Sequence, residues 1–509
     1  HGITRPGETA LVVLRARDDN RPAQPRGKQS NRFDNYSVFY TRTTGIWQTV
    51  WMEPVPDCHL RRPRITPDVA NGMFHLEQPI SQNRLGLKLR ATLRDADGRI
   101  STAECRADLD LAPRLYLPIP EERRRLWSPR DPYLYGLEIE LVDSDGQVID
   151  RASSYAGLRG VAIDGKQVKL NGEVVFQRLV LDQGYYLDGI MTAPTDEDLR
   201  RDIELSMAAG FNGARLHQKV FEERFLFYAD RLGYLVWSEF GDWGCSGFGA
   251  QHDHQQPSIT YAAQWLEALE RDYSHPSIIG WCGLNETAQR LHDRITVLDD
   301  ATRAMFLAAK AMDTTRPVLD TSGYSHRVPE ADIYDSHDYI YEDDFHEGLE
   351  KFKQRHAGLP EGQPFLNPDV NRPTFATMIA LMGGGPLIWS IPYRGQPYFV
   401  SEFGGFKWNP NVPPKSADEN LRSRTTSWGY GSDPVSPEDF FNRFQAVCDV
   451  LLENPDMFGY CYTQLTDVFH EENGLFFFDR GPKFDLERLR AIQARPAAIE
   501  AASDSRVGR

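Results

Sequence analysis

The chain has 509 residues, which is more than one ordinary hydrophobic core accommodates, so two or three domains are expected. Its net charge of −16 argues against a nucleic acid or an anionic membrane as partner, because both require a basic face. Six cysteines without a C-x-x-C motif argue against a structural zinc site, and no apolar run reaches the length of a membrane helix.

The first 157 residues are predicted to be entirely β. Short runs of apolar and β-branched residues, some with alternating polarity, are separated by turn signals rich in Asp and Gly. Strands at this spacing are typical of β-sandwich domains. The predicted strands are 10–16, 37–40, 47–51, 85–93 and 133–142.

After Gly157 the pattern changes to strands that alternate with amphipathic helices. The segment offers eight strands and is long enough for a (β/α)₈ barrel of ~250 residues with insertions. A stretch rich in Pro and Gly, 357–397, is predicted to be an insertion over the barrel mouth. The predicted strands are 173–180, 211–216, 234–238, 277–282, 317–320, 332–336, 398–401 and 457–462, and the predicted helices are 195–209, 221–232, 261–273, 295–312 and 437–453.

Three glutamates follow predicted buried strands, and two of them lie in copies of one tetrapeptide. These segments are Ser238-Glu239-Phe240-Gly241, Asn285-Glu286 and Ser401-Glu402-Phe403-Gly404. The carboxyl ends of barrel strands are where such folds place their chemistry. Two carboxylates that face one cavity can cleave a glycosidic bond, one as acid/base and one as nucleophile. A single glutamate there could equally be a solvated or helix-capping residue, but three in this order argue against that interpretation.

With these motifs the chain resembles glycoside hydrolase family 2, which contains β-galactosidases, β-glucuronidases and β-mannosidases. The stretch 40–51, Tyr-Thr-Arg-Thr-Thr-Gly-Ile-Trp-Gln-Thr-Val-Trp, resembles the family's junction between jelly-roll and immunoglobulin-like domains. The resemblance implies that residues 1–52 are the C-terminal part of a jelly-roll sandwich, 53–157 an immunoglobulin-like sandwich, and 158–509 the catalytic barrel. It also implies that the first domain is truncated at its N-terminus.

The resemblance assigns roles to the glutamates by strand number. Barrels of this clan use the ends of strands four and seven, so Glu286 would be the acid/base and Glu402 the nucleophile. Glu239 follows strand three and would shape the pocket. Because Glu286 must begin protonated, we expect its pKa to be raised by burial and by the charge of Glu402.

Other predicted site residues come from the same resemblance. Asn285 would hydrogen-bond the sugar 2-hydroxyl, and Arg215 would keep Glu402 ionised. His217, two positions after Arg215, would point the same way from its strand and contact the sugar.

Five further candidates lie in loops and strand ends. Either His337 or Tyr339, both after strand six, would bond the nucleophile, and the sequence does not choose between them. Asp182 and Trp428 would form walls of the sugar site, and Tyr462 would take the place of the family's strand-eight tryptophan as its floor.

Two departures from well-known family members narrow the predicted substrate and metal requirement. No lysine occurs in the stretch 472–476, where β-glucuronidases carry an Asn-x-Lys clamp, so a glucuronide loses its most specific support. The stretch 240–245 lacks the acidic cluster that binds magnesium in metal-dependent β-galactosidases. We therefore expect neither a metal nor another cofactor.

The leading hypothesis is an exo-acting retaining β-glycosidase of β-galactosidase type. A β-mannosidase, a β-glucuronidase or a glycosidase of plant-polysaccharide side chains is the alternative within enzymes. A catalytically silent carbohydrate-binding protein is the alternative outside them, although the presence of both Glu286 and Glu402 argues against it. The expected partner is a carbohydrate. The sequence does not decide whether the chain forms a homo-oligomer, and it does not identify the cellular compartment.

Overall fold

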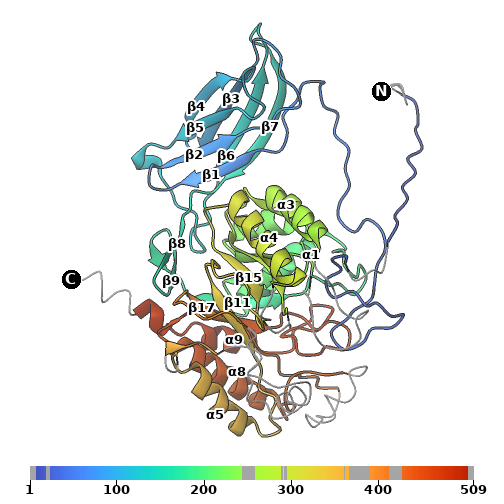
Figure 1. Ribbon diagram of the computed structural model, residues 1–509, viewed down its shortest axis with the longest axis vertical. Coiled ribbons are helices and arrows are strands. Elements are labelled where there is room, and N and C mark those ends of the chain that lie inside the picture. Colours follow the sequence, from blue (N-terminus) through green and yellow to red (C-terminus); the bar gives the residue numbers. More distant parts are fainter. Residues whose placement is uncertain are drawn as a thin grey trace, which may run out of the picture.

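A computed structural model of the chain describes residues 7–18, 23–242, 258–287, 291, 295–359, 362–365, 390–411 and 427–501. Antiparallel β-sheets come first and a parallel barrel with helices around it follows (Figure 1). This order confirms the fold class predicted from the sequence. None of the helices in the described residues is long and apolar enough to cross a membrane.

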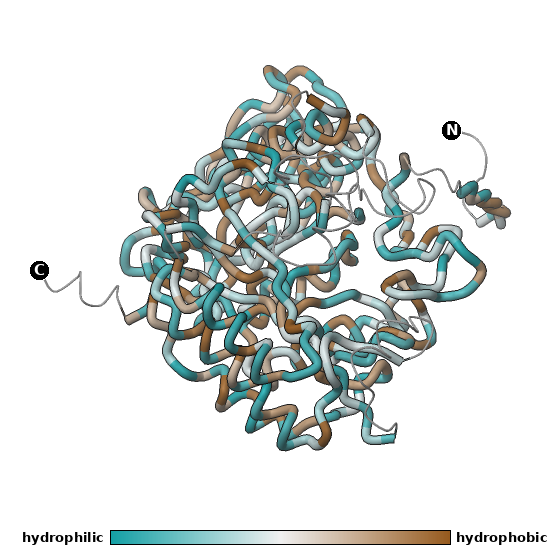
Figure 2. The backbone as a smooth tube through the Cα atoms, turned by 60° about the horizontal axis from the view of Figure 1, so that its bottom comes forward, coloured by the Kyte–Doolittle hydropathy of each residue, from teal (hydrophilic) through white to brown (hydrophobic). Residues whose placement is uncertain are grey.

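The N-terminal segment differs from the prediction, because the described residues before Arg64 form isolated β-bridges and no strand. The run Leu11–Leu14 was predicted as a strand, but each of its residues is at least 67% exposed. Figure 2 shows this part of the chain outside the main body. A strand requires a neighbour for its backbone hydrogen bonds, and neither 10–16 nor 47–51 has one among the described residues. These two strand predictions are wrong for this structure.

Two antiparallel sheets occupy Arg64–Ala156 and enclose their own hydrophobic core. Alternate residues of one strand, Leu89, Ala91 and Leu93, are fully buried, as expected for a sheet with one face on a core. The first sheet has the order β1-β2-β5 and the second β4-β3-β6-β7. The strands are β1 (Arg64–Asp68), β2 (Met73–Glu77), β3 (Lys88–Asp95), β4 (Gly98–Arg106), β5 (Arg114–Pro118), β6 (Tyr135–Val142) and β7 (Val148–Ala156), and a 3₁₀ turn, η1, spans Glu121–Arg123.

A small antiparallel sheet, β8 (Val161–Asp164), β9 (Gln167–Leu170) and β10 (Glu173–Val174), leads into the barrel. Eight parallel strands then follow in the order β15-β14-β13-β12-β11-β18-β17-β16, so the barrel is nearly closed between β15 and β16. In chain order they are barrel strands one to eight, which agrees with the predicted count. Their bounds are β11 (Gln177–Asp182), β12 (Gly213–Leu216), β13 (Leu235–Glu239), β14 (Ile278–Asn285), β15 (Val318–Ser322), β16 (Tyr334–Asp338), β17 (Tyr398–Gly404) and β18 (Met457–Thr463).

Local sequence signals explain where the helices begin and end. The side chains of Thr195, Thr296 and Ser436 each accept a backbone hydrogen bond at a helix N-terminus, and Gly233 ends a helix in the left-handed conformation. The predicted insertion 357–397 lies largely outside the described residues. The helices are α1 (Asp196–Ala208), α2 (Glu223–Leu232), α3 (Ile259–Asp272), α4 (Val297–Met312), α5 (Phe345–His356), α8 (Pro437–Leu452) and α9 (Leu486–Gln493); α5 and α9 were not predicted.

Candidate active site

The barrel brings the three motif glutamates to the carboxyl ends of its strands. Glu239 ends β13, Glu286 directly follows β14, and Glu402 lies near the end of β17. Glu286 has a φ of 45°, in the left-handed region that non-glycine residues rarely adopt, and its N–H donates to the Ser322 carbonyl at 2.8 Å. Such backbone strain concentrates at functional sites, where the surrounding structure holds it in place.

Glu286 and Glu402 face each other across a short gap. One carboxylate oxygen of each, together with a ring nitrogen of His337, all lie within 4.8 Å of one another. The Glu402 side chain is 5% exposed and that of Glu286 is 17% exposed. Retaining glycosidases hold their two carboxyl groups ~5–5.5 Å apart, whereas inverting enzymes need a wider gap for water. The nearest oxygens of Glu286 and Glu402 are close enough to fit the narrower of these two spacings.

Glu402 is held by two hydrogen-bond donors. The Tyr339 hydroxyl donates to its Oε2 at 2.6 Å, and Arg215 Nη1 donates to its Oε1 at 3.3 Å. Burial and the negative charge of Glu402 raise the pKa of Tyr339 well above its ordinary value, so the phenol keeps its proton. The ring of Tyr430 stacks on that of Tyr339 with centroids 3.6 Å apart and so fixes its position.

His337 lies between the two catalytic candidates. Its Nδ1 is 2.8 Å from Glu286 Oε1 and 3.4 Å from Glu402 Oε2, and its Nε2 is 3.0 Å from the Ser322 hydroxyl. Burial lowers the pKa of His337, but the charge of Glu402 and the hydrogen bond to Glu286 outweigh it and raise the pKa overall. The sequence left His337 and Tyr339 as alternatives, and the structure brings both to the carboxylates.

Arg215 bonds the side chains of Glu239 and Asn285 in addition to that of Glu402. Its Nε donates to Glu239 Oε1 at 2.6 Å and its Nη2 to Asn285 Oδ1 at 3.1 Å, while the Gln218 N–H donates to Glu239 Oε2 at 3.1 Å. The amide nitrogen of Asn285 is buried and has no hydrogen-bond partner among the described residues. An unpaired buried donor is costly, so its position beside the carboxylates suits a ligand hydroxyl.

His217 also lies at the carboxylates. Its Nδ1 is 3.5 Å from Glu239 Oε2 and 3.7 Å from Glu402 Oε1. Burial, followed by the positive charge of Lys28, lowers the pKa of His217 well below its ordinary value. The ring is therefore neutral, with one donor and one acceptor nitrogen, and its Nε2 lies 3.3 Å from the Gln218 amide nitrogen.

Two predicted site residues do not lie with the cluster. The Tyr462 ring packs against Phe444 of α8 with centroids 5.0 Å apart, so it faces the helix layer and is not the floor of the site. Because successive strand residues point to opposite faces, its neighbour Thr463 points inward, and the Thr463 hydroxyl lies 3.0 Å from that of Tyr339. Thr463 is thus a site residue that the sequence reasoning missed.

Asp182 is the second correction. It is buried with Asp202 of α1 and Arg480, and Gly184 N–H donates to its Oδ1 at 2.9 Å. Burial and the charge of Asp202 raise the pKa of Asp182 to about 7. The side chain is therefore held in a buried polar network with Asp202 and Arg480, whereas it was predicted to form a wall of the sugar site.

Trp428 is linked to the carboxylates through two other aromatic side chains, Tyr430 and Tyr339. Its Nε1 donates to the Ser37 carbonyl at 3.2 Å, and its ring meets the edge of Tyr430 at 5.4 Å. Trp428 therefore supports Tyr430, which in turn stacks on Tyr339. Tyr430 carries no motif in the sequence, and its role becomes visible only through this stacking.

In the part of the chain that the structure describes, one group of residues has a spacing that suits a metal ion, namely Glu286, His337 and Glu402. Their ligand atoms already contact one another, and the Arg215 guanidinium lies 3.3 Å from Glu402. A cation so close lowers the affinity of this carboxylate for a metal ion, because like charges repel.

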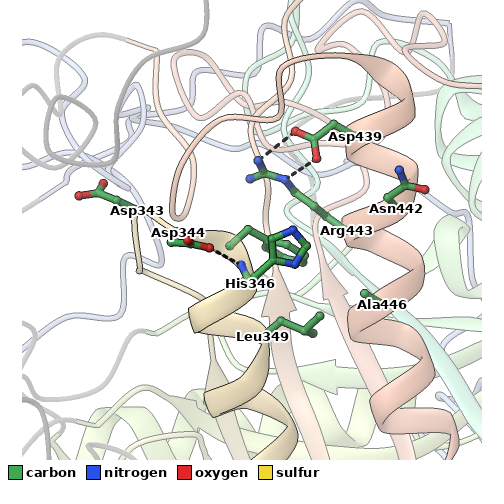
Figure 3. Close-up of a pocket in the computed structure, with 9 residues that line it drawn as sticks. Asp343, Asp344, His346, Leu349, Asp439, Asn442, Arg443 and Ala446 are labelled. Atoms are coloured by element: carbon green, nitrogen blue, oxygen red, sulfur yellow. Dashed lines mark hydrogen bonds and ion pairs between the residues drawn. The ribbon is translucent and has the colours of Figure 1, made fainter.

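A groove of about 640 Å³ lies outside the barrel, between α5 and α8. Figure 3 shows Arg443 paired with Asp439 at its rim and Asp344 bonded to the His346 backbone. None of the candidate catalytic residues lines it, so this groove is separate from the carboxylate cluster.

Two family models match the chain. Residues 58–159 match the model of glycosyl hydrolases family 2, and residues 186–381 match the TIM-barrel domain of the same family. The chain belongs to glycoside hydrolase family 2. The second match contains Glu239, Glu286 and His337, so the family's barrel domain covers much of the site described above.

The chain is also similar in sequence to individual glycosidases. The chain is 28% identical to a β-galactosidase of Alteromonas mediterranea over 60% of its length, which is 28% of that relative. It is 29% identical to a putative β-glucuronidase of Formosa agariphila over 48% of its length, or 29% of the relative. The chain thus spans less than a third of these relatives. A solved β-D-glucuronidase of Dictyoglomus thermophilum shares the fold, with a TM-score of 0.62 at 17% identity over 87% of this chain and 70% of that chain.

Proposed function

We propose that the protein is an exo-acting retaining β-glycosidase that hydrolyses terminal β-linked sugars by double displacement. The observation that carries this proposal is the pair of carboxylate oxygens of Glu286 and Glu402 within 4.8 Å of each other at the ends of strands four and seven. Membership of family 2 supports it, because both family models match the same chain.

In the first step Glu402 attacks the anomeric carbon while Glu286 gives its proton to the leaving oxygen. A glycosyl ester forms on Glu402 and the aglycone departs. Arg215 and Tyr339, which hold Glu402, orient the attacking oxygen. In the second step Glu286, now a carboxylate, removes a proton from water, which attacks the same carbon and frees Glu402.

We propose β-galactosides as the first substrate class, in line with the β-galactosidase names among the relatives. A β-glucuronide is the second candidate, because another relative is named a putative β-glucuronidase. The sequence lacks the lysine of the Asn-x-Lys clamp after strand eight, which weighs against the second candidate.

A panel of p-nitrophenyl α- and β-glycosides tests the proposal. We expect release of nitrophenol from at least one β-glycoside and none from its α-anomer, with the β-configuration retained in the first product seen by proton NMR. Glu402→Ala should be inactive on the same substrate. A first product of inverted configuration would contradict the double displacement, and no release from any β-glycoside would contradict the activity.

A further inference from the structure

A chain of hydrogen bonds between side chains leads away from Glu286 into the wall of the barrel. His337 Nδ1 lies 2.8 Å from Glu286 Oε1, and on the other side of the same ring His337 Nε2 lies 3.0 Å from the Ser322 hydroxyl. The Ser322 hydroxyl in turn donates to Asp335 Oδ2 at 2.8 Å. Ser322 ends β15 and Asp335 is the second residue of β16, the two strands at which the strand order of the barrel begins and ends. The chain therefore connects Glu286 with a second carboxylate, which is buried.

Asp335 is ionised and is held by its other neighbours. Its Oδ1 accepts the Gly323 N–H at 2.8 Å and lies 3.2 Å from His326 Nε2, while His326 Nδ1 is 2.9 Å from Asp320 Oδ1. Burial lowers the pKa of His326, but the charge of Asp320 outweighs it and raises the pKa well above its ordinary value. Burial raises the pKa of Asp335, but the hydrogen bond and the charge of His326 outweigh it and lower the pKa overall. An ionised Asp335 offers acceptors and no donor to Ser322.

The charge of Asp335 determines where the protons of this chain lie. The Ser322 hydroxyl has one proton, and the carboxylate at 2.8 Å is a stronger acceptor for it than the Ser401 hydroxyl, which lies 3.3 Å away. The Ser322 oxygen then offers a lone pair to His337, so Nε2 of the imidazole carries a proton and donates it. In a neutral His337 the other nitrogen, Nδ1, is therefore an acceptor, and it faces Glu286.

The orientation of the His337 ring is fixed by its packing. A Cβ on Gly323 would lie 2.6 Å from this ring, and the φ of Gly323 is 68°, in the left-handed region. Only glycine allows so close an approach without a shift of one of the two residues. The ring of Tyr324 meets that of His337 edge-on, with centroids 6.0 Å apart. These contacts keep the two nitrogens aimed at their hydrogen-bond partners.

The direction of these hydrogen bonds bears on the proton that Glu286 must deliver. An acceptor at Nδ1 stabilises the protonated form of Glu286 before the first step. Burial lowers the pKa of His337, but the charge of Glu402 and the hydrogen bond to Glu286 raise it overall, so Glu286 and His337 hold this proton as a pair. Once the proton has gone to the leaving oxygen, two acceptors face each other across 2.8 Å. Their repulsion makes the pair a stronger base, which takes a proton from water in the second step.

We propose that Asp335, acting through Ser322 and His337, is a positioning residue for acid/base catalysis by Glu286. It keeps a proton on His337 Nε2, so that Nδ1 accepts from Glu286 and the acid retains its proton until the leaving oxygen takes it. The aspartate of a serine-protease triad fixes the tautomer of its histidine in the same manner. This inference rests on the proposed glycosidase activity and adds a residue that does not contact the sugar.

The test is Asp335→Asn, in which an amide replaces the carboxylate. The amide can donate to Ser322, whose hydroxyl then donates to His337 Nε2 and leaves the imidazole proton on Nδ1, where it favours the carboxylate form of Glu286. We expect kcat/KM, which reports the first step, to fall by about 10- to 100-fold for β-glycosides with poor leaving groups, a part of what a general acid contributes. For activated aryl β-glycosides, whose leaving groups need no proton, it should change by less than about threefold.

A double variant shows whether Asp335 acts through Glu286. The acid is already lost in Glu286→Gln, so adding Asp335→Asn should lower kcat/KM for poor leaving groups little further. If the two losses multiply, Asp335 acts by another route and the inference is overturned.

Asp338→Asn is the matched control on the same strand. Asp338 is also buried, but its Oδ2 accepts from Arg355 Nε at 2.6 Å and lies 2.8 Å from His356 Nε2, so it bonds α5 and not the chain that leads to Glu286. This variant should lower the melting temperature and leave the dependence of kcat/KM on the leaving group unchanged. The same dependence in Asp338→Asn as in Asp335→Asn would show a general effect of losing a buried charge and would overturn the inference.

The remaining outcomes separate this inference from the proposed function. If the wild type hydrolyses no β-glycoside, the proposed function fails. If it does, but Asp335→Asn lowers kcat/KM equally for all leaving groups or for none, only the inference about Asp335 is overturned. If Asp335→Asn does not fold, Ser322→Ala decides. It removes the oxygen that accepts from His337 Nε2 and should cause the same selective loss, by about 3- to 10-fold; an equal loss for all leaving groups, or none, overturns the inference.

Discussion

Ser238-Glu239-Phe240-Gly241 and Ser401-Glu402-Phe403-Gly404 are the same tetrapeptide at the ends of two parallel strands, but their glutamates have different partners. Both oxygens of Glu239 are occupied within the fold, one by Arg215 and one by the Gln218 N–H. Glu402 is held by Tyr339 and Arg215 and faces Glu286. The motif alone therefore does not distinguish the two glutamates, whereas their hydrogen-bond partners do.

The largest expected effect is a loss of activity, and it should distinguish the two copies of the tetrapeptide. Glu402→Ala should lower activity by ~10⁴-fold or more, because it removes the nucleophile. Azide should partly restore turnover by entering the space left behind and should yield an α-glycosyl azide, which NMR identifies.

Glu239→Ala is the matched variant of the other copy. It should lower activity without azide rescue, and it should lower the free energy of unfolding by ~3–5 kcal/mol because Arg215 loses a buried partner. Denaturant unfolding measures the second effect. A β-glycosyl azide from Glu402→Ala would mean that the roles of Glu286 and Glu402 are reversed.

Glu286→Gln should show which substrates need a proton donor. Activity on substrates with poor leaving groups should fall by ~10²–10⁴-fold, while activated aryl glycosides should lose far less, since their leaving groups depart without a proton. Steady-state kinetics on a series of leaving groups makes the comparison. An equal loss across the series would contradict the assignment of Glu286 as acid.

Tyr339→Phe sharpens the contrast between the copies further, since a tyrosine hydroxyl bonds Glu402 and none bonds Glu239 among the described contacts. Loss of one hydrogen bond to a charged group should lower kcat/KM by ~10- to 100-fold. The melting temperature should change little if the ring stays stacked on Tyr430. Unchanged kinetics would show that this bond does not serve the reaction.

The smallest effect concerns metal removal. We expect activity to survive EDTA, because the proposed mechanism uses glutamates, an arginine and a tyrosine and requires no Lewis acid in either step. The measurement is activity before and after dialysis against the chelator. Complete loss that magnesium restores would show that ligands were overlooked.

The sequence predicted the barrel well because its signals are local. Each strand is a short apolar run, and residues such as Thr195 and Gly233 mark helix ends by side-chain and backbone chemistry. α5 was missed because its sequence, Phe345–His356, is dominated by charged residues and buries only a narrow face. The run Leu11–Leu14 shows the opposite error, since an apolar sequence forms no strand without a neighbour.

For the site, the motifs located the glutamates, while two errors came from the direction of side chains. Tyr462 packs against Phe444 of α8, and Asp182 is buried beside Asp202 of α1. Both side chains therefore point from their strands toward the helices, whereas the prediction needed them to point inward. Thr463 could have been found by counting alternate positions along β18. Tyr430 could not, because its stacking on Tyr339, which bonds Glu402, arises from packing between segments distant in sequence.

The most direct test of the central claim is to trap the covalent intermediate. A β-glycoside of the preferred sugar with fluorine at C2 slows the second step, so the glycosyl ester accumulates on the nucleophile. After proteolysis, mass spectrometry should find the fluorosugar on the peptide that contains residues 399–402, attached to Glu402. A label on Glu239 instead would contradict the assignment of roles to the two copies of the tetrapeptide.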